Sequence, residues 1–368
     1  MMKRVASIDI LRSLTMLLML WVNDFAHMDG IPAWMLHAPT KVDMLGLSDL
    51  AFPSFLFCMG LSVPYALESR IAKGEGTVRT LGHILVRSLS LILLGLMELN
   101  GGGNWYSLVL GLAIFFIWND YPRTCNKWLR IALTGLGLGA IACLARSVWP
   151  MHTGWWGILG LIGWSYLLCA VLYLVFRKVR FAIPVIWALV IAMLIMRDSG
   201  LRFVPSYPGG WVHAGLAFTG VLCSTVSRHL SEKGRSASFP VWAFGGAVLM
   251  TAGFLACHKF WIISKNMGTP TWMFVSLAID LALTAVLFYV ADVRGHSSWA
   301  RPIRAAGVAT FTCYCLPLVI NPLMDLLCLR LPDTVRSGCT GLLLAFIFAL
   351  FVIFIADMLS RIHIRLKL

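Results

Sequence analysis

The sequence has little charge. Aspartate, glutamate, lysine and arginine make up 12% of its 368 residues, whereas hydrophobic residues make up 59%. Soluble domains carry about 25% charged residues, so this composition excludes an ordinary soluble protein and indicates an integral membrane protein. No polar stretch is long enough to form a separate soluble domain, and we therefore expect a single membrane domain over residues 1–368.

Acidic residues are scarcer than basic ones, 16 against 30, which gives a net charge of +14. An excess of positive charge often indicates a nucleic-acid partner, but in a membrane protein lysine and arginine collect in the short cytoplasmic loops. We therefore expect the lipid bilayer as the partner of this surface and no nucleic acid.

Motifs for metal and nucleotide chemistry are missing. No Cys-x-x-Cys pair stands beside a second pair or a histidine cluster, and no P-loop, Gly-x-Gly-x-x-Gly, His-Glu-x-x-His or Gly-x-Ser-x-Gly motif occurs. Most of the ten cysteines lie inside apolar runs, as small buried hydrophobic residues do. We expect no metal and no disulfide framework; whether Cys328 and Cys339 pair stays open.

Long apolar segments are abundant. A bilayer-spanning helix needs about 20 apolar residues, and about twelve segments approach this length, with 10–12 as the expected range. The sequence thus predicts an all-α, polytopic integral membrane protein. The approximate centres of the segments are Met16, Phe57, Leu91, Ala113, Gly137, Leu167, Leu189, Gly220, Met250, Leu281, Cys313 and Ala345.

Every second loop between the apolar segments is rich in lysine and arginine, and this alternation predicts how the chain is oriented in the membrane. Because such loops stay in the cytoplasm, we expect both termini there and the connector around His37 on the outer face. The first apolar segment lacks a small-residue cleavage site, so we expect it to be retained. We expect a multi-pass protein of a bacterial inner membrane. Representative basic residues of the predicted cytoplasmic side are Lys3, Arg4, Arg70, Arg123, Arg177, Arg228, Arg294 and Arg361.

Polar groups concentrate between Ser7 and Val63, where two apolar segments flank a polar connector. Stranding such groups in hydrocarbon costs several kcal/mol each, so a protein that only spans the membrane would not carry them. Residues 1–68 are therefore the candidate reaction centre, a helix pair with its connector. The polar groups are Asp9, Arg12, Asn23, Asp24, His37, Asp43 and Asp49.

This stretch resembles the family of heparan-α-glucosaminide N-acetyltransferase and its bacterial relatives, including the NagX-type membrane proteins. The resemblance covers about the first sixty residues; beyond them only the many-span layout and a few Trp-Gly patches are similar. The matching motifs are Ser7-x-Asp9-x-x-Arg12, Val22-Asn23, His37-Ala38, Leu47-x-Asp49-Leu50, Phe52-Pro53-x-Phe55-x-Phe57 and Gly60-x-Ser62.

The resemblance implies a transmembrane acetyltransferase that passes acetyl from cytoplasmic acetyl-CoA to an amino sugar across the bilayer. The catalytic histidine of the family falls on His37 and its partnering asparagine on Asn23. The segment after His37-Ala38 departs from the family, and the connector from Asn23 to His37 is longer, so the acceptor stays open: free glucosamine, a glycan end or a cell-wall fragment. Related enzymes indicate a homodimer, on which this sequence is silent.

Acyl transfer to an amine needs a base, a donor for the developing oxyanion, and positioning. His37 suits the base because imidazole titrates near neutrality, and Asp49, or less well Asp43, is placed to orient it. The amide of Asn23 is a candidate oxyanion donor, although Asn23 and Asp24 also fit a helix cap. Direct transfer and an acetyl-histidine intermediate both remain open.

Charged groups at the predicted cytoplasmic side are candidates for binding CoA. Asp9 and Arg12 lie i,i+3 on one helix face, which fits an ion pair or a charged wall beside the CoA. Arg79, His83 and Arg87 line one side of the third segment. The first two suit snorkelling to the interface, whereas Arg87 lies deeper and fits a CoA phosphate or a carboxylate partner.

Acidic residues are candidates for binding the amine of the acceptor: Asp24, Asp43, Glu98 and Asp280. Asp280 lies in mid-span, where a carboxylate is a functional candidate by default, although it also fits a protonated structural group. Two other functions compete with an N-acetyltransferase. A transporter of N-acetylglucosamine or a related sugar would need a midplane site on broken helices. An O-acetylating enzyme of envelope polysaccharides carries its histidine within the first span, where this chain has Val22-Asn23.

Overall fold

The computed structural model describes residues 5–122, 124–201 and 203–367, and in these ranges the regular elements are helices. Lys3, Arg4 and Arg123, which entered the predicted orientation, lie outside the described residues. The first eight helices are α1 (Ala6–Phe25), α2 (Ser48–Ala72), α3 (Thr77–Asn100), α4 (Asn104–Trp118), α5 (Lys127–Ser147), α6 (Gly157–Phe176), α7 (Ala182–Asp198) and α8 (Trp211–Glu232).

The remaining elements include several short or distorted turns. They are η1 (Ser236–Ser238), α9 (Phe239–Cys257), α10 (Pro270–Phe288), the π-helical η2 (Tyr289–Val293), η3 (Ser298–Ile303), α11 (Arg304–Val308), α12 (Thr310–Cys315), α13 (Pro317–Leu326) and α14 (Gly338–Arg361).

The all-helical, polytopic architecture is confirmed, but the count of twelve spans is not. All twelve predicted centres fall in helices, yet in the described ranges eight helices are long and apolar enough to cross a membrane, or nine if one bent pair forms a single span. Helix α4 has 15 residues and α7 has 17, so both are short for a span. Helix α8 is long enough, but its sequence is not sufficiently apolar. The orientation of the termini remains a prediction.

The bent pair is the segment predicted around Cys313. Its two halves, Ser298–Val308 and Thr310–Leu326, meet at Ala309 with a bend of 70°. A glycine sets the approach of the first half to α1: a Cβ on Gly307 would lie 2.4 Å from the backbone oxygen of Asp9. Because only glycine permits this contact, the break is held directly against the start of α1.

The N-terminus of α1 receives its cap from a distant residue. Asp292 in η2 accepts hydrogen bonds from the backbone amides of Ala6 (2.8 Å) and Ser7 (2.9 Å). Val5, the local cap residue, offers no side-chain acceptor. The carboxylate satisfies amides that a helix start otherwise leaves unpaired and ties α1 to the end of α10.

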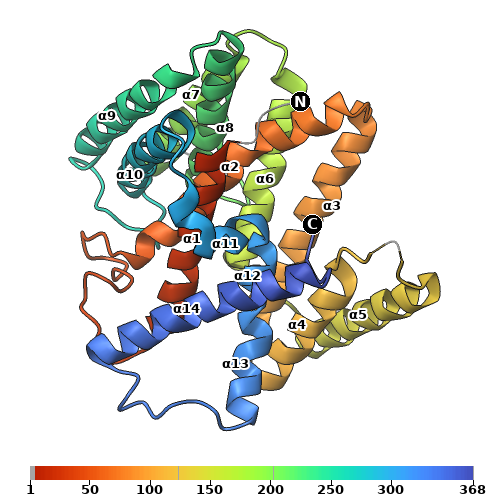
Figure 1. The fold of residues 1–368 in the computed structure, drawn as a ribbon. Coiled ribbons are helices and arrows are strands. Elements are labelled where there is room, and N and C mark those ends of the chain that lie inside the picture. The colour runs from red at the N-terminus through yellow and green to blue at the C-terminus, as the bar shows by residue number, and fades with distance from the viewer. Residues whose placement is uncertain (1–4, 123, 202, 368) are drawn as a thin grey trace.

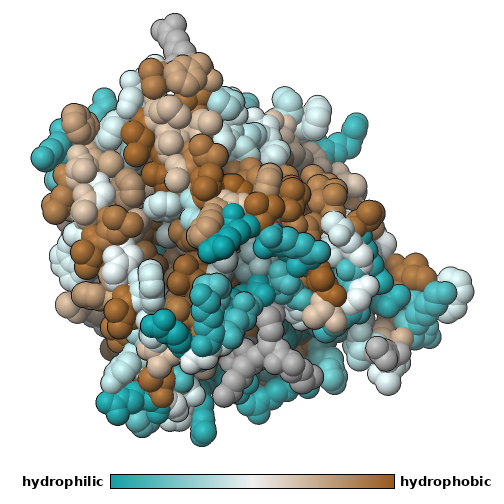
Figure 2. Space-filling view, turned by 90° about the horizontal axis from the view of Figure 1, so that it is seen from above, coloured by the Kyte–Doolittle hydropathy of each residue, from teal (hydrophilic) through white to brown (hydrophobic). Residues whose placement is uncertain are grey.

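Helices α1, α2, α8 and α10 form the buried centre, with α3 and α6 packed together beside it. Figure 1 shows α14 crossing the lower end of α1, with which it packs, and α5 extending outward beyond α4, which is its main packing partner. In the view from above, hydrophilic side chains gather in the lower half, with apolar side chains dominating elsewhere (Figure 2). This pattern suits helices with polar ends and lipid-facing sides.

Glycines bring α2 and α8 into backbone contact. A Cβ on Gly60 would lie 1.8 Å from the carbonyl oxygen of Ala217, and one on Gly220 would lie 2.2 Å from that of Phe57. Small residues that allow such approach are typical of helix pairs in membranes. The contact fixes α2, whose first turn carries part of the candidate site.

We predict that Gly60→Ala forces α2 and α8 apart. Overpacking costs about 1–3 kcal/mol, so the apparent Tm in detergent should fall by about 5 °C. Gly82→Ala is the matched control, because Gly82 is also in a helix and a Cβ there has nothing within 4 Å. Equal Tm values for the two variants would contradict this account of the α2–α8 contact.

Candidate active site

His37 and Asp49 meet at the start of α2, as the sequence predicted for a base and its orienting carboxylate. Nδ1 of His37 lies 2.8 Å from Oδ1 of Asp49. Asp49 is buried, with 2% of its side chain exposed, whereas 41% of the His37 side chain is exposed. Because a carboxylate only accepts hydrogen bonds, Nδ1–H of His37 donates and the other ring nitrogen, Nε2, is left as the acceptor.

The connector folds back on itself around the Asp49 carboxylate. Oδ2 of Asp49 accepts from the backbone amides of Ala38 (3.0 Å) and Gly46 (3.2 Å). Only glycine fits at position 46, because a Cβ there would lie 1.9 Å from the carbonyl oxygen of Leu36. Two backbone donors and an imidazole therefore surround a charge that burial would otherwise destabilise.

The loop between α9 and α10 fastens the connector from outside. Asp43 accepts from the backbone amide of Ile263 (2.8 Å) and lies 2.7 Å from Nε2 of His258. The Ile263 hydrogen bond, and then that of His258, hold the pKa of Asp43 below its ordinary value. Asp43 thus acts as a structural anchor here, and the structure does not place it beside His37.

Lys265, in the same loop, is a site neighbour that the sequence reasoning did not select. Its Nζ lies 3.3 Å from Nδ1 of His37. Burial lowers the pKa of Lys265, and the charge of Asp49 opposes that effect. No local pattern indicates this contact, because more than two hundred residues separate the lysine from the connector.

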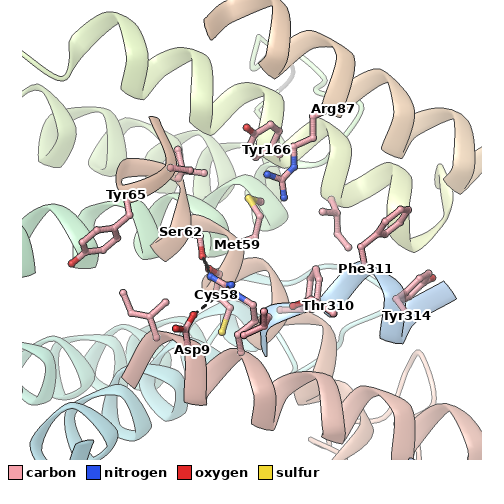
Figure 3. Close-up of a pocket in the computed structure, with 18 of the residues that line it drawn as sticks. Asp9, Cys58, Met59, Ser62, Tyr65, Arg87, Tyr166, Thr310, Phe311 and Tyr314 are labelled. Atoms are coloured by element: carbon pink, nitrogen blue, oxygen red, sulfur yellow. Dashed lines mark hydrogen bonds and ion pairs between the residues drawn. The ribbon is translucent and has the colours of Figure 1, made fainter. Parts of the chain in front are cut away.

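A first cavity, here called the Arg87 cavity, has a volume of about 540 Å³ and is enclosed by α1, α2, α3, α6, α11 and α12. Asp9, Arg12 and Arg87 line it, as predicted for a CoA site. Figure 3 shows Arg87 reaching into this space beside Tyr166, whose ring centroid lies 4.6 Å from the guanidinium carbon. Nε of Arg87 is buried and has no hydrogen-bond partner among the residues that the structure describes.

Of the other basic residues proposed to bind CoA, one lines this cavity and two lie outside it. Arg12 lies on its wall, bonded to Ser62 (2.5 Å) and to the carbonyl oxygen of Gly307 (3.0 Å) and 3.8 Å from Asp9. Arg79 and His83 are exposed and do not line the cavity. Of the row of three on α3, only the deepest residue reaches the site.

A second cavity, the Asn23 cavity, has a volume of about 350 Å³. Asn23, Asp24 and Glu98 line it, between α1, α3, α4 and α13. Asp24 is paired with Arg336 at 3.3 Å, and Oε2 of Glu98 accepts from the hydroxyl of Tyr314 at 3.0 Å. Oε1 of Glu98 is buried and has no partner within the described part of the chain.

Tyr314 lines both cavities, and His37 lines neither. The structure therefore brings His37 together with Asp49 but places Asn23 in a separate wall. Asp280 also lies apart: it is 1% exposed within α10, and its Oδ1 accepts from the hydroxyl of Ser54 at 2.6 Å. Its Oδ2 is buried without a partner among the described residues, and Asp280 lines neither cavity, so its part in amine binding remains a prediction.

Comparison with known proteins places the site in a family. Residues 4–206, more than half of the chain, match the family described as a domain of unknown function, DUF5009. The chain belongs to this family. The matched range includes His37, Asp49, Arg87 and both halves of the α3–α6 pair, so it contains most of the candidate site.

Two relatives of this DUF5009 protein are heparan-alpha-glucosaminide N-acetyltransferases. The mouse enzyme is 28% identical over 142 residues, which are 33% of this chain and 21% of that enzyme. The human enzyme is 34% identical over 97 residues, 26% of this chain and 14% of that enzyme. The chain thus matches about a fifth or less of their length. These matches support the resemblance to the heparan-α-glucosaminide N-acetyltransferase family, but they do not single out its NagX-type members.

The described residues form neither a cluster of metal ligands nor a disulfide. In those ranges no cluster of three or more histidine, cysteine or acidic side chains is arranged to hold a metal ion. All ten cysteines are free, Cys328 and Cys339 among them, and both of these are exposed.

We predict that Asp43→Ala loosens the loop at residues 258–269. Losing a hydrogen bond to a charged group costs about 1.5–3 kcal/mol, so amide hydrogen exchange in this loop should accelerate at least about tenfold at pH 7. Because the pKa of Asp43 is lowered, its contact stabilises the protein above the ordinary carboxyl pKa and is lost only as pH falls through the lowered value.

The matched control is Asp333→Ala, an exposed carboxylate in another loop. Unchanged exchange at residues 258–269 in Asp43→Ala would show that Asp43 does not hold the loop.

Proposed function

We propose that this protein is a transmembrane acetyltransferase, which transfers acetyl from cytoplasmic acetyl-CoA to the amine of a glucosamine-type sugar at the outer face. The observation that carries the proposal is the pair of an exposed imidazole and a buried carboxylate, His37 and Asp49, inside the range matched by the family. The partial similarity to two N-acetyltransferases supports the same reaction class.

The Arg87 cavity is the proposed site of the donor. Its volume suits a ligand of cofactor size, and the unpaired Nε of Arg87 is a buried donor that lacks an acceptor. A phosphate oxygen of CoA would supply one, because arginine binds phosphate through charge-assisted hydrogen bonds. Arg12, on the opposite wall, adds a second positive charge, and Asp9 lies next to it.

The Asn23 cavity is the proposed site of the acceptor. Oε1 of Glu98 lacks a partner there, and a sugar ammonium group would provide donors for it. Asp24 already has Arg336 as its counter-ion, so its proposed part in amine binding is weaker. The amide of Asn23 faces the same space and is the proposed donor to the developing oxyanion.

His37 lines neither cavity, so this mechanism requires the sugar ammonium group and the acetyl thioester to reach Nε2 of His37 from their cavities. There His37 would take one proton from the ammonium group, so that the amine nitrogen can attack the thioester carbon. The carbon–sulfur bond then breaks, and the imidazolium returns the proton to the CoA thiolate, while the second proton of the new amide nitrogen passes to solvent. Asp49 holds the ring through Nδ1–H and stabilises the imidazolium. An acetyl group carried transiently on Nε2 would give the same products in two steps.

A transporter of N-acetylglucosamine or a related sugar is the second candidate, and a specific feature favours it. The bent pair around Ala309 is a broken helix, which transporters use to build midplane sites. It places Tyr314 between two cavities, as an alternating-access protein would require. The imidazole–carboxylate pair has no part in this second function.

We predict that purified protein releases CoA from acetyl-CoA only when glucosamine is present, and that His37→Ala slows this release by about 10²–10⁴-fold. Loss of the base leaves the amine protonated near neutral pH. His27→Ala is the matched control, because His27 is an exposed histidine of the same connector. Free CoA is measured with a thiol reagent in detergent.

The same preparations distinguish the two candidates in liposomes. No CoA release, together with uptake of labelled N-acetylglucosamine that His37→Ala leaves intact, would replace the acetyltransferase with the transporter.

We predict that Arg87→Met weakens acetyl-CoA binding at least about tenfold, because a charge-assisted hydrogen bond to phosphate contributes about 1.5–3 kcal/mol. KM for acetyl-CoA should rise with little change in kcat, and calorimetry with CoA alone should show the same loss. Arg79→Met, two turns away on the same helix and exposed, should bind normally. Equal affinities in the two variants would remove the Arg87 cavity as the donor site.

A further inference from the structure

Besides His37 and Asp49, the site contains a lysine, Lys265, from the loop between α9 and α10. Nζ of Lys265 lies 3.3 Å from Nδ1 of His37, the same nitrogen that lies 2.8 Å from Asp49. An ammonium group, an imidazole and a buried carboxylate therefore share one small volume, and the lysine comes from the part of the chain beyond the family match.

Contacts on both sides of Lys265 fix its backbone against the connector. The hydroxyl of Ser264 donates to the carbonyl oxygen of Thr40 at 2.9 Å, and the side-chain amide of Asn266 donates to the hydroxyl of Thr40 at 3.1 Å. Asp43 binds the same loop at Ile263. These contacts hold the loop backbone on either side of Lys265 against the connector, which places the lysine next to His37.

The three groups do not share one hydrogen bond. Nδ1–H of His37 is donated to Asp49, so the ammonium of Lys265 acts on the ring through its charge. Burial lowers the pKa of Lys265, and the negative charge of Asp49 opposes that shift and favours the ammonium form. A positive charge at this distance disfavours a second positive charge on the imidazole.

We propose that Lys265 is a positioning residue of the His37 site, whose ammonium offsets the pull of Asp49 and keeps Nε2 of His37 unprotonated and ready to accept a proton. Asp49 by itself would favour the imidazolium in the resting protein, so that less free imidazole would be present to accept a proton. The two charges together orient the ring without forcing a proton onto it. The role in acetyl transfer rests on the proposed function, whereas the electrostatic effect on His37 does not.

The other charged side chains of the connector and the loop should affect the protonation of His37 less than Lys265 and Asp49 do. Asp43 and His258 face each other at 2.7 Å and are occupied as a pair. Lys41 on the connector and Lys259 on the loop are exposed, so solvent screens their charges.

The test measures the reactivity of His37 toward diethyl pyrocarbonate, which modifies the neutral imidazole, between pH 5 and 9. Mass spectrometry of the peptide containing His37 gives the rate, with the full-length protein in detergent and without any substrate. The variants are Lys265→Met, Lys265→Gln and Lys265→Arg, with Lys259→Met as the exposed control from the same loop.

We expect the midpoint of the profile to move up by about one pH unit in Lys265→Met and Lys265→Gln, since a nearby like charge shifts titration by about this much or more. Reactivity below the midpoint should then fall about tenfold. Lys265→Arg keeps the charge and Lys259→Met leaves the site intact, so both should keep the wild-type midpoint.

An unchanged or lowered midpoint in the two neutral variants would overturn the proposal. A loss of reactivity at every pH without a shift would also overturn it, because that result describes a merely structural lysine. Rates of CoA release give the second readout: the neutral variants should lose activity at pH 7 and recover it as the pH rises. If wild-type protein releases no CoA, the proposed function fails while the reagent profile still decides the role of Lys265.

Discussion

The burial of one negative charge determines how the connector folds. A carboxylate removed from water costs several kcal/mol unless donors replace the lost hydration, and Asp49, at the first turn of α2, is 2% exposed. The amides of Ala38 and Gly46 and the ring of His37 supply those donors, so the connector must turn around this carboxylate. The position of the imidazole is a consequence of solvating Asp49.

A second constraint is the close approach of the broken helix to α1. Gly307 lets the segment before the bend rest on the backbone at Asp9, and the bend at Ala309 directs α12 between the two cavities. Tyr314 then lies on both walls and is bonded to Glu98. A passage between the proposed donor and acceptor sites would therefore run past this tyrosine, and either proposed function needs such a passage.

The burial of Asp49 and the bend at Ala309 together separate three sites: the Arg87 cavity, the Asn23 cavity and the imidazole of His37. Positive groups on one cavity suit phosphate, and an unpaired carboxylate oxygen in the other suits an ammonium group. The imidazole is held at the start of α2 and is contacted by the loop between α9 and α10, more than two hundred residues away in the sequence. The family match covers the imidazole, the carboxylate and Arg87, whereas Lys265 and Tyr314 lie beyond it.

The sequence by itself determined the class of protein and the pairing of His37 with Asp49, because hydrophobic segments and a local motif depend on residues close together in the chain. Asp9, Arg12 and Arg87, which the sequence proposes for CoA, all line the Arg87 cavity. Only the tertiary structure decided that Arg79 and His83 stay outside, that Asp43 anchors a loop, that Asp280 packs in the core, and that Lys265 joins the site. Those outcomes depend on which faces of the helices pack together and on which distant loops contact the site. The spacing of side chains along one helix carries no information about partners two hundred residues away.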